Sequence, residues 1–107
     1  MEKRSPHYNL TRVQVLVVRL GTAAFTKTAL DGGRAMGVTT AEMLAVIASL
    51  SRSNFFKSMT TFSDYRVWQD VYHAATPVRK YAYIKVTLRD AAPVIQFKER
   101  RPCRENV

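Results

Sequence analysis

The sequence predicts an α+β fold in which N-terminal helices pack on one face of a C-terminal antiparallel β-sheet. Three observations predict it. Apolar residues in the first half recur at helical spacing, which is typical of helices with one buried face. After Ser53, β-branched and aromatic residues alternate with polar ones, which is typical of strands. The connections between these strands are short, which favours antiparallel neighbours, and helices followed by strands indicate an α+β domain.

The first helix is predicted to begin at Thr11, because Thr11 and Gln14 have the spacing of a capping box. Gly21 marks its end. Its apolar residues share one face: Val13, Leu16, Val17 and Leu20.

A second helix is predicted over about 26–36, although Gly32 and Gly33 each cost about 1 kcal/mol relative to alanine in a helix. The third helix begins with a capping box formed by Thr39 and Glu42. Glu42 is the only charged residue within 35–51, so this helix is expected at the centre of the core. Its buried stripe is Met43, Leu44, Ile47 and Leu50.

Four strands are predicted, over 57–62, 66–73, 79–89 and 93–98. The segment YAYIKVTLR (81–89) alternates, so its apolar residues face the helices while Tyr83 and Lys85 face outward. In the last strand Ile95 and Phe97 are expected inward, with Gln96 and Lys98 outward. The strand 66–73 is ambiguous. Trp68 facing inward would put Gln69 outward, but it would also turn Asp70 inward and leave Val67 and Val71 outside.

The charge of the chain points to a polyanionic partner. Its 107 residues are enough for one domain and include 17 Lys and Arg against 8 Asp and Glu, a net charge of +9 with a pI near 10.2. Such a field attracts nucleic acid ahead of a membrane surface. No signal peptide or apolar run of membrane-spanning length is seen, so a cytoplasmic protein is expected. Cys103, a lone thiol, forms no disulfide framework and no zinc site.

The outward face of the sheet interleaves tyrosines with basic residues. Aromatic rings stack on unpaired bases while Lys and Arg hold phosphates, which favours binding of single-stranded RNA. A solvated face of an amphipathic sheet is the alternative. From the residues alone, the prediction stops at a basic α+β domain that binds nucleic acid.

Several segments together resemble the MqsR toxins, the motility quorum-sensing regulator family. They are MEKRSPH (1–7), Leu50-Ser51, FFKSMTTFSD (55–64), VWQDVY (67–72), YIKVT (83–87) and FKE (97–99). The resemblance implies a RelE/YoeB-like bacterial RNase fold over a single domain, 1–100, followed by a basic tail, 101–107. It also implies the toxin of a type II toxin–antitoxin system, an mRNA interferase that cleaves single-stranded mRNA at GC-containing triplets such as GCU or GCA without a metal ion or other cofactor.

The resemblance assigns the catalytic roles to Lys57, Gln69, Tyr83 and Lys98. Cleavage of RNA needs a group that takes the proton of the 2′-hydroxyl, positive charge on the phosphorane and a donor to the leaving oxygen. Lys57 and Lys98 are expected to supply the charge. Tyr83 would transfer a proton or donate a hydrogen bond, and Gln69 would orient the phosphate or a base. Free Tyr and Lys titrate near 10. Either neighbouring charges lower these pKa values or positioning supplies most of the rate.

Further residues are expected to bind RNA without cutting it, mainly through phosphate contacts. They are Arg79, Lys80, Tyr81, Lys85, Arg89 and His73. His7 and His73 are both expected at the surface, and His73 at the end of a strand. Phe56 and Phe62 replace tyrosines of the family, and the loop 73–80 lacks a glycine, which leaves the geometry of its hairpin open.

The implied partner is a cognate MqsA-like antitoxin, a zinc-binding helix-turn-helix protein that represses the shared operon, so that DNA is contacted only through the antitoxin. A non-catalytic RNA- or DNA-binding module, which keeps only antitoxin binding, is the alternative function. A ribosomal or nucleoid-type protein is disfavoured because long basic extensions are absent.

Overall fold

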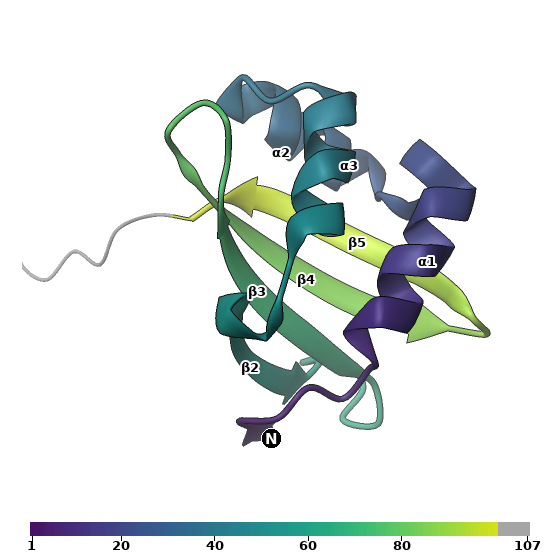
Figure 1. Cartoon of the computed structure of the whole chain (residues 1–107). Helices are drawn as coiled ribbons and strands as arrows, with labels where there is room; N and C mark the ends of the chain where they lie inside the picture. The colour runs from purple at the N-terminus through teal and green to yellow at the C-terminus, as the bar shows by residue number, and fades with distance from the viewer. Residues whose placement is uncertain (101–107) are drawn as a thin grey trace, which may run out of the picture.

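Three helices cover one face of a five-stranded antiparallel sheet in the computed structural model, which describes residues 1–100 (Figure 1). The tail 101–107, including Cys103, lies outside the described residues. The helices are α1 (Leu10–Leu20), α2 (Lys27–Met36) and α3 (Thr40–Ser49), with 3₁₀ turns η1 (Gly21–Ala24) and η2 (Arg52–Asn54). The strands are β1 (Glu2–Lys3), β2 (Phe55–Thr60), β3 (Trp68–Ala75), β4 (Tyr81–Arg89) and β5 (Ala92–Glu99). The predicted α+β class is confirmed.

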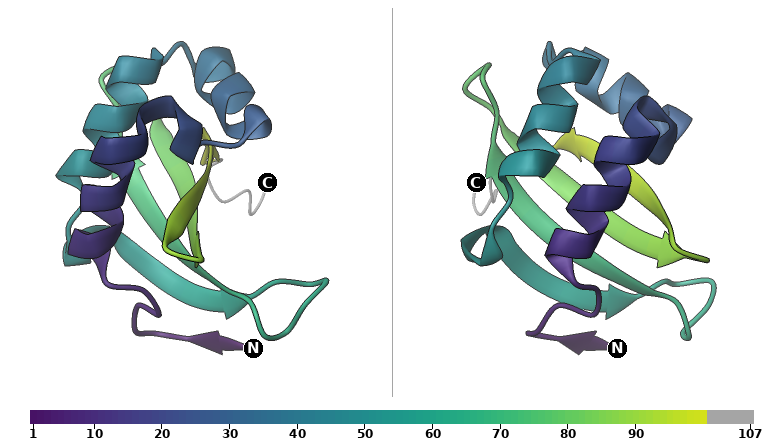
Figure 2. Two further views of the ribbon diagram at one scale, coloured as in Figure 1. Left: turned by 90° about the vertical axis from the view of Figure 1, so that its right-hand side faces the viewer. Right: turned by 45° about the vertical axis from the view of Figure 1, so that its right-hand side comes forward.

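The strands lie in the sheet in their order along the chain, β1-β2-β3-β4-β5. All three helices lie between β1 and β2 in the sequence, so this pair joins segments far apart in the chain. The sequence did not predict β1, because two residues are too few for any periodicity. Figure 2 shows the opposite face of the sheet without a helix over it. None of the helices within residues 1–100 has the length and apolar character that a membrane-spanning helix requires.

The start of α1 differs from the prediction. Asn9, not Thr11, is the N-cap, and its side-chain oxygen accepts a hydrogen bond from the backbone N–H of Arg12 at 2.9 Å. Gly21 ends the helix with φ of 61°, as expected. Leu20 is 42% exposed rather than buried, and Val17 is the last fully buried residue of α1.

The two glycines of α2 allow close packing. A Cβ at Gly32 would collide with the backbone carbonyl oxygen of Phe97 on β5, and one at Gly33 would collide with the Met43 side chain on α3. The helix therefore lies closer to both neighbours than any other residue would permit. The predicted bounds of α2 are confirmed, with Thr26 as its N-cap.

The capping box of α3 is confirmed in both directions. The Thr39 N–H donates to the Glu42 carboxylate at 2.9 Å, and the Glu42 N–H donates to the Thr39 hydroxyl at 3.1 Å. Met43 and Ile47 are fully buried, so α3 lies at the centre of the core as predicted.

The ambiguous strand has Asp70 facing the helices, where it is 1% exposed. Its carboxylate accepts hydrogen bonds from the backbone N–H groups of His7 at 2.9 Å and Tyr8 at 2.8 Å. A buried carboxylate satisfied in this way is stable, and it fastens the N-terminal segment to the sheet. Val71, on the other face, is nevertheless buried between its cross-strand neighbours Lys57 and Lys85.

Both hairpins that join β3, β4 and β5 contain non-glycine residues with positive φ. Arg79 adopts φ of 63° in a turn closed by the Thr76 hydroxyl, which donates to the Lys80 carbonyl oxygen at 2.7 Å. Asp90 and Ala91 adopt φ of 50° and 62° in the two-residue turn between β4 and β5, the conformation that matches the twist of a tight hairpin. Because Arg79 belongs to the turn, the strand predicted over 79–89 begins two residues later than expected, at Tyr81.

Candidate active site

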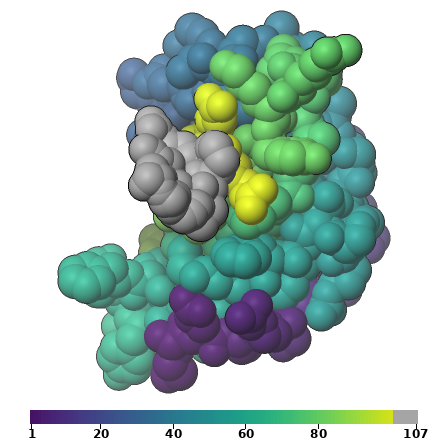
Figure 3. Space-filling view, turned by 90° about the vertical axis from the view of Figure 1, so that its left-hand side faces the viewer, coloured from purple at the N-terminus to yellow at the C-terminus, as the bar shows by residue number. Residues whose placement is uncertain are grey.

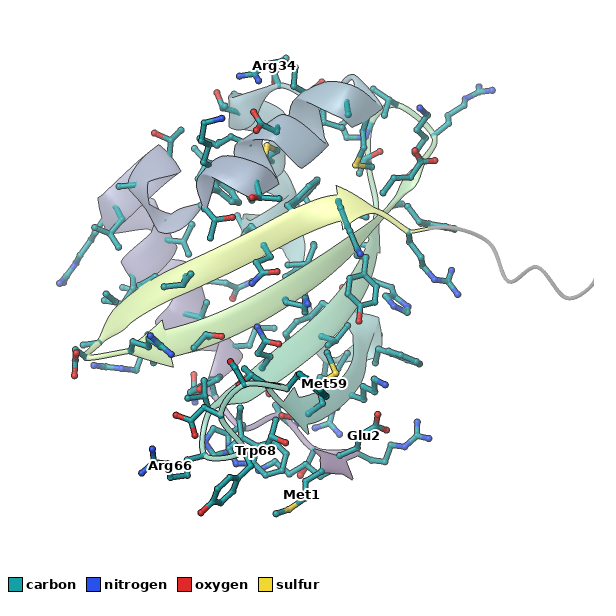
Figure 4. All side chains as sticks on the ribbon, turned by 180° about the vertical axis from the view of Figure 1, so that it is seen from behind. Met1, Glu2, Arg34, Met59, Arg66 and Trp68 are labelled. Carbon is teal, nitrogen blue, oxygen red and sulfur yellow. The ribbon has the colours of Figure 1, made fainter. Side chains whose placement is uncertain are left out.

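By strand register, all four candidate catalytic residues lie on the open face. We define the open face as the face of the sheet turned away from the helices, which is the face toward the viewer in Figure 4. Lys57 comes from β2, Gln69 from β3, Tyr83 from β4 and Lys98 from β5. Residues directly opposite one another on neighbouring strands form rows across this face. Tyr83 pairs with both His73 and Lys98, so these three residues form one row.

Two further rows follow along the strands, each two residues from the last and so about 7 Å away. The second row contains Lys57, Val71, Lys85 and Gln96. The third row, which contains Gln69, is Met59, Gln69, Thr87 and Val94. The expected quartet is thus brought to one face but spread over three rows, and Gln69 lies about 14 Å along the strands from the row of Tyr83.

Tyr83 and Lys98 are the closest pair of the quartet. The ammonium nitrogen of Lys98 lies 5.5 Å from the centre of the Tyr83 ring. On the other side of Tyr83, the His73 ring lies 5.4 Å away, tilted by 39°. Lys98 is exposed and Tyr83 is half-buried, so the phenol is held by its neighbours while the ammonium reaches solvent.

His73 is half-buried inside β3, not a surface residue at the end of a strand. The reason is Phe56, whose ring stacks on His73 at 4.5 Å. The Nε2 atom of His73 is buried, and it has no hydrogen-bond partner within residues 1–100. Burial, followed by the charge of Arg100, lowers the pKa of His73 below its ordinary value. A neutral ring therefore packs beside Tyr83.

Lys57 is engaged by a carboxylate that the sequence did not reveal. Its ammonium nitrogen lies 2.7 Å from a carboxylate oxygen of Glu2, which β1 brings onto the open face. Only 22% of the Lys57 side chain is exposed. The hydrogen bond and charge of Lys57 lower the pKa of Glu2. A phosphate that binds Lys57 must therefore compete with Glu2.

Lys85 lies between the row of Tyr83 and that of Gln69. Burial, followed by the charge of Lys98, lowers the pKa of Lys85 below its ordinary value. Lys85, Tyr83 and Lys98 line a hollow of about 150 Å³ together with Thr28, in the first turn of α2. Lysine ammoniums and the positive end of a helix dipole make this hollow suitable for an anion.

Gln69 lines a different groove, of about 350 Å³, at the other end of β4. The part of it that comes from the sheet consists of Gln69 itself with Thr87, Arg89, Val94 and Gln96. The loop 61–67 between β2 and β3 forms the rest and projects away from the helices (Figure 2).

The residues expected to bind RNA lie mainly along β4. Tyr81 and Arg89 are exposed at its two ends, with Lys85 between them on the same face. Arg79 and Lys80 lie in the turn before it, and the Lys80 ammonium is 3.8 Å from the Glu99 carboxylate. The predicted strand 57–62 was wrong at its end, because β2 stops at Thr60 and Phe62 lies on the loop 61–67. Sequence reasoning gave no binding role to Phe62 or to Tyr65 on the same loop, although both rings are exposed. Their only signal was an aromatic pair around the predicted break at Ser63.

Within residues 1–100, no group of three or more His, Cys, Asp or Glu side chains is placed to hold a metal ion.

Comparison with known proteins agrees with the resemblance seen in the sequence. Residues 5–99 match the family model described as "Motility quorum-sensing regulator, toxin of MqsA". The mRNA interferase toxin MqsR of Escherichia coli (strain K12) is 41% identical over 100 residues, an alignment that covers 94% of this chain and 100% of that protein. The chain therefore belongs to the MqsR family of motility quorum-sensing regulator toxins.

Proposed function

We propose that this protein is the toxin of a type II toxin–antitoxin system and an endoribonuclease that cleaves mRNA. Its family and the name of its Escherichia coli relative support this function. The observation that carries the proposal is the direct cross-strand pairing of Tyr83 with Lys98, next to Lys85, on the open face. These groups meet the chemical needs of phosphodiester cleavage within a single hollow.

In the proposed reaction, the 2′-oxygen of the RNA attacks the adjacent phosphorus while its proton passes to a protein group. The bond from phosphorus to the 5′-oxygen breaks, and that oxygen takes up a proton. The products are a 2′,3′-cyclic phosphate and a 5′-hydroxyl end. Lys98 and Lys85 stabilise the charge on the phosphorane, and the Tyr83 hydroxyl exchanges a proton at the reacting oxygens.

His73 and Lys57 support this arrangement from either side. The neutral His73 ring and the Lys98 side chain fix the plane of the Tyr83 ring, which positions its hydroxyl. Lys57 lies one row away and contacts a neighbouring phosphate once RNA displaces Glu2 from its ammonium. Arg79 and Lys80, both exposed in the turn before β4, contact phosphates further along the RNA.

We propose single-stranded mRNA as the substrate, with cutting at GC-containing triplets such as GCU or GCA. The open, basic face with exposed aromatic rings favours unpaired bases, which can stack on those rings. The triplet preference rests on the resemblance to the family. The partner is an MqsA-type antitoxin, which the family's description of a "toxin of MqsA" supports. That this antitoxin is a zinc-binding helix-turn-helix protein rests on the resemblance alone.

The test is cleavage of a GCU-containing RNA by the purified protein. We expect fragments that end in a 2′,3′-cyclic phosphate. Tyr83→Phe and Lys98→Ala should each lower the cleavage rate by at least about a hundredfold, since each removes a group that acts in the transition state. Arg19→Ala removes an exposed basic residue from α1, on the helical side, and should leave the rate unchanged.

Two results would contradict the proposal. RNA that is retarded in a gel but stays intact would identify the protein as the non-catalytic binding module. Full activity of both Tyr83→Phe and Lys98→Ala would place the chemistry elsewhere.

A further inference from the structure

We infer that the groove containing Gln69 binds a nucleobase and reads it, so that Gln69 and Arg89 determine sequence specificity and do not act on the scissile phosphate. This inference rests on the proposed function, because it names how that same face recognises its RNA. It removes Gln69 from the catalytic quartet that the sequence predicted.

The first argument is position. Asp70 pairs with Val86, so Gln69 lies one step further along, beside Thr87, with which it lines the groove. Tyr83 lies four residues before Thr87 on β4, a separation of about 14 Å. Side chains on a strand stand roughly perpendicular to the sheet, so the Gln69 carboxamide and the Tyr83 phenol remain similarly far apart. Groups that act on one phosphate must lie within hydrogen-bond reach of it, about 3 Å. Gln69 therefore faces a different part of the RNA.

The second argument is chemistry. A phosphate offers only acceptors, whereas the edge of a base offers donors and acceptors at fixed spacing. The carboxamides of Gln69 and Gln96 each carry both, and the Arg89 guanidinium is a planar fork of donors that matches the acceptor pair of guanine. Val67 and Val94 add apolar surface that can lie against a ring. This combination suits a base better than a phosphate.

The third argument is the aromatic loop. The Phe62 side chain has no cover at all, at 108% relative exposure, and Tyr65 is 72% exposed. Both stand on the loop 61–67, whose residues Thr61 and Ser63 line the groove. In Figure 3 the segment that follows β2 projects as a knob from the body of the molecule. An exposed ring beside a groove is placed to stack on a base.

The loop is also held in place. The N–H of Thr61 donates to the Val67 carbonyl oxygen at 2.9 Å, and the Thr61 hydroxyl donates to the Asp64 carbonyl oxygen at 2.7 Å. The Asp64 carboxylate forms an ion pair with Arg66, whose Nε lies 3.2 Å from Oδ1, and this pairing offsets its repulsion of an RNA phosphate. A wall that is ordered before binding loses little freedom when a base enters.

Gln96 connects the groove to the cleavage hollow, because it lines both. An RNA strand that follows β4 and β5 would place its scissile phosphate near Tyr83 and Lys98 and a nearby base in the groove. Recognition and cleavage would then occur at separate places along one strand.

The test compares kcat/KM for RNAs that differ by one base at each position of the preferred triplet. Wild type should discriminate at the recognised position by about tenfold to a hundredfold. Gln69→Ala and Arg89→Ala should lose most of that discrimination while they still cut the poorer substrates. Arg79→Ala, at the opposite end of β4, is the matched control and should lower kcat/KM equally for every RNA.

An equal loss on every substrate in Gln69→Ala and Arg89→Ala, with unchanged discrimination, would overturn the inference and return Gln69 to catalysis. If wild type cuts no RNA, the proposed function fails, and the groove is judged by binding alone. The four ribonucleoside 5′-monophosphates would then be titrated into the labelled protein. Backbone amide shifts at Thr87 and Arg89 that depend on the base support the groove, and identical shifts for all four bases refute it.

Discussion

The orientation of the Tyr83 ring is set by the side chains that surround it. Its ring lies between the cationic Lys98 and the neutral His73, which is itself covered by Phe56. The ammonium is attracted to the face of the ring, and the stacked rings exclude water from its other side. The phenol is thus fixed in orientation before any RNA arrives, which is what positioning a reactive group requires.

The half-buried His73 predicts a pH dependence at the scale of one residue. The pKa of His73 is lower in the folded protein than in the unfolded chain, so the unfolded state binds its proton more readily. The stabilising contribution is present above the ordinary pKa, about 6.5, and is lost as the pH falls from there towards the folded value. The free energy of unfolding, measured with urea, should therefore decrease as the pH is lowered from 7.5 to 5.5.

His73→Phe keeps an aromatic ring between Phe56 and Tyr83 but cannot titrate, so its decrease should be smaller. His7, whose pKa is also lowered, mainly by burial, accounts for part of what remains. His7→Gln, measured in the same way, gives the share of the decrease that comes from His7. A wild-type stability that is flat over this range would show that His73 titrates alike in both states.

At the scale of elements, α2 depends on its glycines. Gly32→Ala should raise intrinsic helix propensity by about 1 kcal/mol. The new methyl group would nevertheless collide with backbone of β5, and forcing extra atoms into a packed contact costs about 1–3 kcal/mol. We expect a net loss of stability in urea unfolding.

Gly33→Ala is the matched control, because the atom it meets belongs to the flexible side chain of Met43. It should be tolerated better than Gly32→Ala. Gly32→Ala should also shift the first turn of α2 away from the hollow near Lys98. Equal stability of both variants and wild type would mean that α2 can move away from β5 at little cost.

The strand β1 is the element that changes the interpretation of the site. Its two residues bring Glu2 onto the open face against Lys57. No pattern in the sequence links positions 2 and 57, because their proximity depends on Asp70 holding the segment that contains His7 and Tyr8. A buried carboxylate on β3 therefore decides the charge that surrounds a lysine on β2.

At the scale of the whole molecule, the net charge of +9 predicts a strong salt dependence of RNA binding. The logarithm of the binding constant should fall linearly with that of the salt concentration, with a slope of about −0.7 per phosphate contact for single strands. Arg79→Ala and Lys80→Ala should each reduce the slope by about 0.7, as measured by titration in the non-cleaving Tyr83→Phe background.

Arg34→Ala, on α2 and remote from the open face, should leave the slope unchanged. A slope that is the same in all variants would exclude the turn before β4 from the RNA path.

Local patterns were sufficient for the three helices and for the faces of β4 and β5, but not for β1 or for the face of β3. The capping box at Thr39, the stop at Gly21 and the alternation along 81–89 each depend on residues close in sequence, and each was confirmed. Boundaries set by side chains outside the periodic stretch were predicted wrongly, such as the cap at Asn9. The inward position of Asp70 could not be deduced, because its partners lie more than sixty residues away in the chain.

The sequence by itself determined the α+β class, the basic charge and, through its motifs, the family and the residue types of the site. Only the tertiary structure decided that Tyr83 and Lys98 are direct neighbours, that Glu2 engages Lys57, and that Gln69 lies in a separate groove. The physical reason is that alternation along a strand decides which face a side chain occupies. Register between strands decides which side chains meet, and it is set by pairing and packing across the whole sheet.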